Sequence, residues 1–323
     1  MAVFIGRLAD VGIAKESSRG VGVAAQYSLP KTNITFDDKV NKAVSEEGLG
    51  SIVGYGNQAI VTQQFSEGNI DGEINANSFG LIMLALFGGD TPTTVQTSAT
   101  KHTFALSNSN AHQTLSIHGS DPVADRIFEG CMLDSLDIDI SLEKIVNFSA
   151  SFKGKKGQDS TFTPSYSADY KFVGRDLVFK VAADTASLAA ASAVSLKELK
   201  LSFKKHAEHD FILGTIEPEA GLNKQIIIEG TLKLNYEAVT MRDYMLNGTY
   251  RAMSILLSQT RDTLGTGGSS LYFEFPRVDF FEWERERAND DPVTQTINFR
   301  CLYDLTTSKV ISDCYIINMV ASY

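Results

Sequence analysis

The segment His206-Ala207-Glu208-His209 is the nearest approach in the sequence to a metal or acid–base cluster. Two histidines three positions apart lie on opposite faces of a strand, whereas the HExxH arrangement places two ligands on one helical face. We therefore expect no metal site and interpret both as exposed histidines at a strand end. The remaining histidines, His102, His112 and His118, have no Cys or Ser partner at a catalytic motif spacing, so only a nucleophile and base brought together by the fold would change this interpretation.

Phosphate and base recognition are also poorly supported. Gly54-Tyr55-Gly56 lacks the third glycine and the preceding strand of a dinucleotide loop, and no G-x-x-x-x-G-K-[ST] occurs. The aromatic residues Phe280, Phe281 and Trp283 are interspersed with glutamates, which disfavour nucleic acid. Packing in a core or an interface is the better interpretation.

Groups of aspartates could be mistaken for calcium or glycosidase carboxylates. Asp290-Asp291-Pro292 has the composition of a turn. Asp137 and Asp139 alternate with apolar residues and are interpreted as the solvated face of a strand. The sequence thus predicts neither an enzyme nor a bound cofactor or metal.

Charge, apolar runs and cysteine content exclude further classes of protein. The 323 residues carry a net charge of −10, which argues against a protein that grips nucleic acid through its phosphates. The longest apolar run, Phe79 to Phe87, is too short to cross a membrane, and the N-terminus lacks the order of a secretory signal, so synthesis in the cytoplasm is expected. Cys131, Cys301 and Cys314 form no CxxC pair and are expected to be reduced core residues.

Alternation of apolar and polar residues predicts a mainly β chain. Leu136 to Ile140 is the clearest strand, and period-two patterns recur in four later segments: Val194 to Phe203, Ile226 to Leu234, Leu271 to Phe281 and Thr294 to Cys301. Two segments predict helices instead. An apolar stripe runs over Phe79 to Phe87 before Gly88-Gly89, and a second follows Ala238 to Met245 and ends at Gly248.

A repeated motif precedes both helices. Ile70 to Asn77 and Ile228 to Asn235 share the pattern I-[DE]-G-x-[IL]-x-x-N, and each is followed by a helix, a strand, a long strand and a return strand. We therefore predict two tandem modules, residues 1–160 and 161–323, joined by the turn-rich segment 157–169. The segment 31–56 shows neither helical nor period-two patterning and is expected to be a long loop of the first module.

These patterns resemble the major tail tube proteins of siphophages. The resemblance is carried in the second half by Asn223-Lys224-Gln225, Phe281 to Arg285, Val293 to Thr296 and Leu302-Tyr303-Asp304, and in the first half by Gly68 to Gly89 and Phe128 to Cys131. It implies modules built as a β-sandwich or small barrel with one flanking helix. It also implies that subunits form rings, that the rings stack, and that their inner sheets surround the path of the DNA.

The resemblance also implies where the protein is found and which proteins it contacts. We expect a structural subunit of the virion tail, assembled in the host cytoplasm, whose partners are copies of itself and the tape measure, tail terminator and distal tail proteins. Viral DNA would pass through the lumen without specific binding, and no membrane is involved. Two modules per chain favour a trimer with pseudo-sixfold symmetry over a hexamer. The alternative is a tail-tip or adhesin β-sandwich that binds host-surface carbohydrate.

Two sets of residues are candidates for this role. Asp137 and Asp139 are the candidates to face the lumen, with the outer surface as the equal alternative. The loop is expected to order against the neighbouring ring, and deletion of Thr35 to Glu47 is expected to leave a folded monomer that does not polymerise. The candidate ring-stacking residues are Thr35, Asp37, Asp38, Lys39, Glu46 and Glu47.

Overall fold

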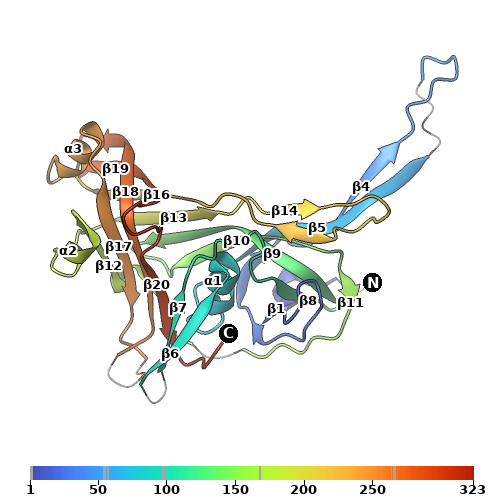
Figure 1. Cartoon of the computed structure of the whole chain (residues 1–323), viewed down its shortest axis with the longest axis horizontal. Helices are drawn as coiled ribbons and strands as arrows, with labels where there is room; N and C mark the ends of the chain where they lie inside the picture. Colours follow the sequence, from blue (N-terminus) through green and yellow to red (C-terminus); the bar gives the residue numbers. More distant parts are fainter. Residues whose placement is uncertain are drawn as a thin grey trace.

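One antiparallel sheet runs through both halves of the chain (Figure 1). The computed structural model describes residues 3–53, 56, 58–96, 99–166, 169–262, 264 and 267–323. The strands of this inner sheet lie in the order β5–β10–β9–β13–β16–β19–β18, with β3 and β4 paired to β5. Their bounds are β3 (Lys31–Ile34), β4 (Asp37–Val44), β5 (Ala59–Glu73), β9 (Asp125–Ser141), β10 (Asn147–Gly154), β13 (Glu198–Lys204), β16 (Ile227–Asn235), β18 (Ser270–Glu286) and β19 (Thr294–Cys301).

The two longest strands, β9 and β18, continue into outer sheets. The start of β9 pairs with β8 (Leu115–Ser120) and β11 (Gln158–Asp159), and β8 leads to β1 (Asp10–Lys15) and β2 (Tyr27–Ser28). The start of β18 pairs with β17 (Arg251–Ser258) and β20 (Asp313–Asn318). β12 (Leu177–Ala182) extends the sheet beyond β17, and β7 (Ala99–Phe104) and β6 (Asp90–Gln96) extend it beyond β20. The mainly β prediction is confirmed.

Short elements complete the chain. β14 (Glu208–Asp210) and β15 (Ala220–Leu222) form a separate hairpin. The helices are η1 (Gly6–Leu8), α1 (Phe79–Phe87), η2 (Gly174–Asp176), α2 (Thr185–Leu188) and α3 (Thr240–Leu246). Both helices expected from the sequence are present, and α1 ends at Gly88, whose φ of 85° is the left-handed conformation that glycine adopts readily.

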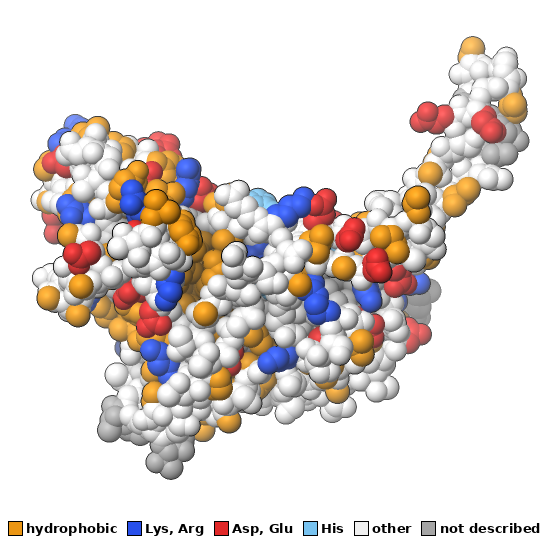
Figure 2. Space-filling model, in the orientation of Figure 1, with side chains coloured by type: hydrophobic (Ala, Val, Ile, Leu, Met, Phe, Trp, Pro, Cys, Tyr) orange, Lys and Arg blue, Asp and Glu red, His pale blue; other side chains and the backbone are white. Residues whose placement is uncertain are grey.

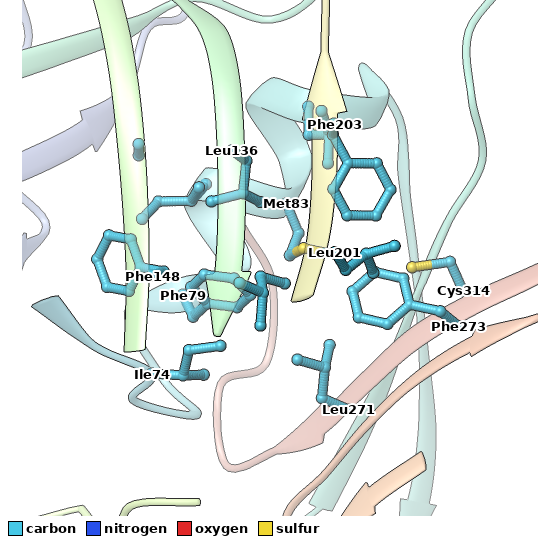
Figure 3. Packing of buried hydrophobic residues seen from close by; sticks show 14 of the residues in the cluster. Ile74, Phe79, Met83, Leu136, Phe148, Leu201, Phe203, Leu271, Phe273 and Cys314 are labelled. Carbon is cyan, nitrogen blue, oxygen red and sulfur yellow. The ribbon is translucent and has the colours of Figure 1, made fainter. Parts of the chain in front are cut away.

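The hydrophobic core is shared by both halves of the chain. Figure 3 shows Phe79 and Met83 of α1 among Leu136 and Phe148 of the first half and Leu201, Phe203 and Phe273 of the second. The predicted apolar stripe on α1 understated its burial, because all nine residues of the helix are buried. Strands of both halves and the C-terminal residue, Tyr323, which packs against Gly80, leave no solvent face.

The two halves use the same strand order and the same register. In chain order, β1, β3, β5, α1, β8, β9 and β10 of the first half match β12, β13, β16, α3, β17, β18 and β19 of the second. Gly72 on β5 lies opposite Phe148 on β10, and Gly230 on β16 lies opposite Phe299 on β19. A Cβ on Gly72 would come within 3.0 Å of the Phe148 ring, and one on Gly230 within 2.4 Å of the Phe299 ring. A backbone carbonyl oxygen lies even closer, Pro30 O at 2.8 Å for Gly72 and Lys200 O at 2.3 Å for Gly230, so both positions require glycine.

The prediction of a loop at residues 31–56 was wrong. β3 and β4 occupy much of this segment, and β4 pairs with β5 from Asp37↔Glu67 to Val44↔Ala59. The result is a two-stranded hairpin, here called the arm, that projects from the molecule at the end away from α3 (Figure 1). Periodicity did not indicate these strands, because most of β4 is exposed and no buried face requires alternating apolar residues. Gly54 and Tyr55 lie outside the described residues.

Candidate assembly surfaces

The inner sheet has one apolar and one polar face. On β9, Leu136, Ile138 and Ile140 are buried in the core while Asp137 and Asp139 point the other way, as strand geometry requires. The same alternation on the neighbouring strands places a group of polar side chains together. We call this surface the polar face; it includes Asp71, Asp137, Asp139, Ser149, Lys200, Ser202, Glu229, Thr231 and Asn298, which line one shallow depression of the sheet.

Side chains on the polar face bind one another across strands. Asp71 accepts hydrogen bonds from Asn33 Nδ2 at 3.1 Å and from Ser149 Oγ at 2.5 Å. Thr231 Oγ1 donates to Asn298 Oδ1 at 2.8 Å, and Asn298 in turn donates to Glu282. These cross-strand pairs hold polar side chains flat against the sheet, so the surface is both hydrated and ordered.

The polar face is of mixed charge. Arg300 Nε lies 3.1 Å from Glu229, Lys200 Nζ lies 2.9 Å from Glu198, and Lys233 Nζ lies 2.8 Å from Glu286. Within the described part of the chain, neither Asp137 nor Asp139 takes part in an ion pair. Asp139 lies opposite Lys200 and interacts with it electrostatically, whereas Asp137 lies opposite Ser202.

The predicted ring-stacking residues fall into two groups, those held at the base of the arm and those exposed to solvent. Asp38 belongs to its base, since it pairs with Arg126 at 3.0 Å and accepts a hydrogen bond from the Gly157 backbone at 2.7 Å. Thr35 Oγ1 likewise accepts from the Asn69 backbone at 3.0 Å. Asp37, Lys39, Glu46 and Glu47 are exposed.

The sequence reasoning missed the apolar residues of the arm. Val40, Val44, Ile52 and Ile60 are each at least half exposed. Figure 2 shows hydrophobic side chains along the arm and acidic ones near its tip. A two-stranded hairpin that exposes apolar side chains is marginal in water, so the arm has the composition of a segment that gains stability from a partner.

The β14–β15 hairpin supports the base of the arm. The ring of His209 lies 5.3 Å from that of Phe65 on β5 and 5.7 Å from that of Phe211, and the backbone N–H of Gln64 donates to Ile216 O at 2.7 Å. Burial, aided by the nearby Lys153, lowers the pKa of His209 to about 4, so this ring is neutral at pH 7. The prediction that His206 and His209 are both exposed holds for His206 alone.

The other histidines are occupied in hydrogen bonds. His102 bonds with Asp90 at 3.0 Å and with the Val320 carbonyl, His112 with the carbonyls of Leu86 and Ser107, and His118 with that of Val23. The three cysteines are buried and unpaired. Across the described residues no group of three or more His, Cys, Asp or Glu side chains could hold a metal ion.

A buried lysine joins the two halves beside α1. Lys205, just after β13, donates from Nζ to Ala85 O near the C-terminal end of α1 at 2.6 Å, a position where a cation is favoured by the helix dipole. The same segment returns to the first half through the Ala207 N–H, which donates to Asp134 Oδ1 at 2.7 Å. Burial, together with the nearby Arg19, lowers the pKa of Lys205 to about 7.

Fold and surfaces together describe a structural protein whose distinctive features are a continuous polar sheet face and a projecting arm. Residues 6–301 match the family model described as Phage tail tube protein. The chain therefore belongs to the phage tail tube protein family, a structural component of the virion tail. A search of curated proteins gave no match. In the described part of the chain, no helix has the length and apolar character needed to cross a membrane.

We expect the stability of the unassembled subunit to depend on pH through Lys205. Its pKa in the folded chain lies below the ordinary 10.5, so between about pH 7 and 10 the unfolded chain binds more protons, and the unfolding free energy should rise with pH. Lys205→Met should remove this rise, which amounts to roughly 1.4 kcal/mol per pH unit at most. Urea unfolding at pH 7, 8 and 9 measures it.

The control is Lys39→Met, which changes an exposed lysine of the arm. Its unfolding free energy should follow the wild-type dependence on pH. Parallel profiles for wild type and Lys205→Met would show that Lys205 is protonated throughout.

Proposed function

We propose that this chain polymerises into stacked rings that form the tail tube of a long non-contractile bacteriophage tail and conduct DNA during ejection. The observation that carries the proposal is the polar face, which continues from β5 to β18 without interruption while the opposite face of the same strands forms the core. A sheet with one wet and one dry side can line a water-filled bore. On this proposal the polar face, with Asp137 and Asp139, lines the lumen.

We further propose that the chain consists of two tandem tube modules, residues 1–160 and 161–323, and that three chains close one pseudo-sixfold ring. Support comes from the shared strand order and from the equivalent pairs Gly72↔Phe148 and Gly230↔Phe299. Equivalent modules present equivalent edges, so six modules close a ring whether they come from six chains or three.

The arm is proposed to contact the neighbouring ring. Its exposed apolar residues and its marginal stability as an isolated hairpin support this role. Tube growth in the host cytoplasm would be guided by the tape measure protein inside the lumen and bounded by the tail terminator and distal tail proteins. DNA would pass through the lumen without specific contacts.

The number of chains per ring tests the ring proposal. End-on class averages of purified tubes, computed without imposed symmetry, should show six similar lobes that alternate in detail. Mass per unit length from scanning transmission microscopy should correspond to three chains per ring. Six chains per ring would refute the trimer, and failure of the purified protein to form rings or tubes would refute the assembly role.

Shortening the arm should stop polymerisation without unfolding the subunit. Deletion of Thr35 to Glu47 would remove Asp38 and all of the pairing between β4 and β5, so the better variant joins Val40 to Gln64 through Asn-Gly in place of residues 41–63. We expect a folded monomer by circular dichroism and no tubes by electron microscopy. Tubes of normal length from this variant would exclude the arm from stacking. The control, Lys144→Ala, changes an exposed lysine outside the arm and should form tubes.

Charge on the polar face should influence ejection but not assembly. Asp137→Lys with Asp139→Lys adds cations to the proposed lumen, where they would attract passing phosphates and slow DNA release. Phage carrying this pair should assemble and eject DNA more slowly in a fluorescence release assay, while Asp137→Asn with Asp139→Asn should change the rate less. A tube reconstruction with both residues on the exterior would contradict the assignment.

A further inference from the structure

Apart from the arm, each end of the inner sheet has one strand with an unpaired edge among the described residues. The final part of β18, Asp279 to Glu286, pairs with β19 on one side only, and β3 pairs only with β5 among the strands that the structure describes. Both edges carry free backbone N–H and C=O groups, which other strands can pair with. They lie at opposite ends of the strand order, because β3 borders β5 and β18 follows β19.

The junction between the two halves supplies a template for these edges. Inside the chain, β9 pairs with β13 in antiparallel register, with Asp137 opposite Ser202 and Leu136 opposite Phe203. By its place in the repeated strand order, β18 is the counterpart of β9, and β3 is the counterpart of β13. The equivalent of the β9–β13 pairing would therefore be a pairing between β18 and β3, whose edges are both free within one chain.

Pairings within each half fix the corresponding residues. Asp137 lies opposite Ser149, the residue after Phe148. Asp279 lies opposite Arg300, the residue after Phe299. Asp279 therefore corresponds to Asp137, and Val278 to Leu136. On the other strand, Ser202 lies opposite Glu229 and Asn33 opposite Asp71. Asp71 and Glu229 each precede the glycine of the repeated motif. Asn33 therefore corresponds to Ser202, and Ile34 to Phe203.

The two helices α1 and α3 differ in the same way, because a strand of the other half packs against α1 and none packs against α3 within the described chain. The ring of Phe87 at the end of α1 lies 6.1 Å from that of Phe203 on β13, and α1 is buried throughout. Its counterpart α3 buries Met241 but leaves Leu246 64% exposed. The residue that corresponds to Phe203 for α3 is Ile34, which is only half-buried within its own chain.

We propose that β3 of one copy pairs with the free edge of β18 in the next copy, with Asn33 opposite Asp279, the first residue of β18 beyond the Arg251↔Val278 pair. This proposal rests on the proposed ring and specifies its contact. The Asn33 amide can donate to the Asp279 carboxylate on the polar face. On the core face, this register brings Ile34 toward the exposed side of α3. Each ring then closes as one uninterrupted sheet.

Paired cysteines test the register. In tubes of Asn33→Cys with Asp279→Cys, the two Cβ atoms would be about 5 Å apart, close enough to be joined by a disulfide or a short bis-methanethiosulfonate. After oxidation, non-reducing denaturing electrophoresis should show a ladder that ends at three chains. The native cysteines are buried and give little background.

The matched control is Asn33→Cys with Glu286→Cys. Glu286 lies roughly 20 Å farther along β18, so no link should form in tubes. Tubes that form normally but link only through Glu286, or do not link, would overturn the register while leaving the ring intact. If wild-type protein forms no rings or tubes, the proposed function fails and the edge pairing with it.

Hydrogen exchange of the wild-type protein gives a second measurement that needs no variant. The outward-pointing amide protons of Lys31 to Asn33 and Asp279 to Phe281 should exchange at least tenfold more slowly in tubes than in monomers. Equal exchange rates in the two states would overturn the edge pairing.

Discussion

Backbone pairing between β9 and β13 is the interaction on which the rest of the structure depends. It joins a strand of the first half to a strand of the second over Ser135–Ser141 and Glu198–Lys204. Because side chains alternate along a strand, a slip of one residue would turn Leu199, Leu201 and Phe203 toward water and bring charged residues into the core. The pairing therefore fixes the shared core and the continuity of the polar face at once. α1 and the hydrogen bond from Lys205 to Ala85 add further contacts across the same junction.

This constraint explains why the polar face is ordered as well as hydrophilic. Strands held in register bring Glu229 beside Arg300 and Asp71 beside Ser149, so acids meet donors across strands. Each exposed ion pair contributes little to stability, on the order of 1 kcal/mol or less. Their main effect is on the electrostatic potential, because paired charges cancel at distances beyond a Debye length of about 10 Å. A chain with a net charge of −10 can in this way present a nearly balanced polar face, on which Asp139 lies opposite Lys200 and Asp137 opposite Ser202.

Sequence reasoning succeeded where the signal was local. The alternation in Leu136 to Ile140 placed Asp137 and Asp139 opposite the core, and Gly88 marked the end of α1, because both features depend on neighbouring residues. Sequence reasoning failed where a feature depends on contacts between residues far apart in the chain. The burial of α1 needs Phe203 and Tyr323, and the role of Asp38 at the base of the arm needs Arg126. The arm itself could not be predicted from periodicity, since a hairpin exposed on both faces has no buried side to impose a pattern.

The free edges also bear on how a monomer avoids incorrect pairing before it assembles. The edge of β18 carries Glu282, Glu284 and Glu286, so two copies that met through this strand would bring like charges together. β3 is only four residues long, has an irregular register against β5, and contains Lys31 but no acid. Because β3 is short and irregular, it pairs poorly with β3 of another copy. The acidic edge of β18 repels the same edge of another copy. Pairing between the unlike edges of β3 and β18 has neither disadvantage. In the proposed ring, this pairing would add each new subunit in the same direction.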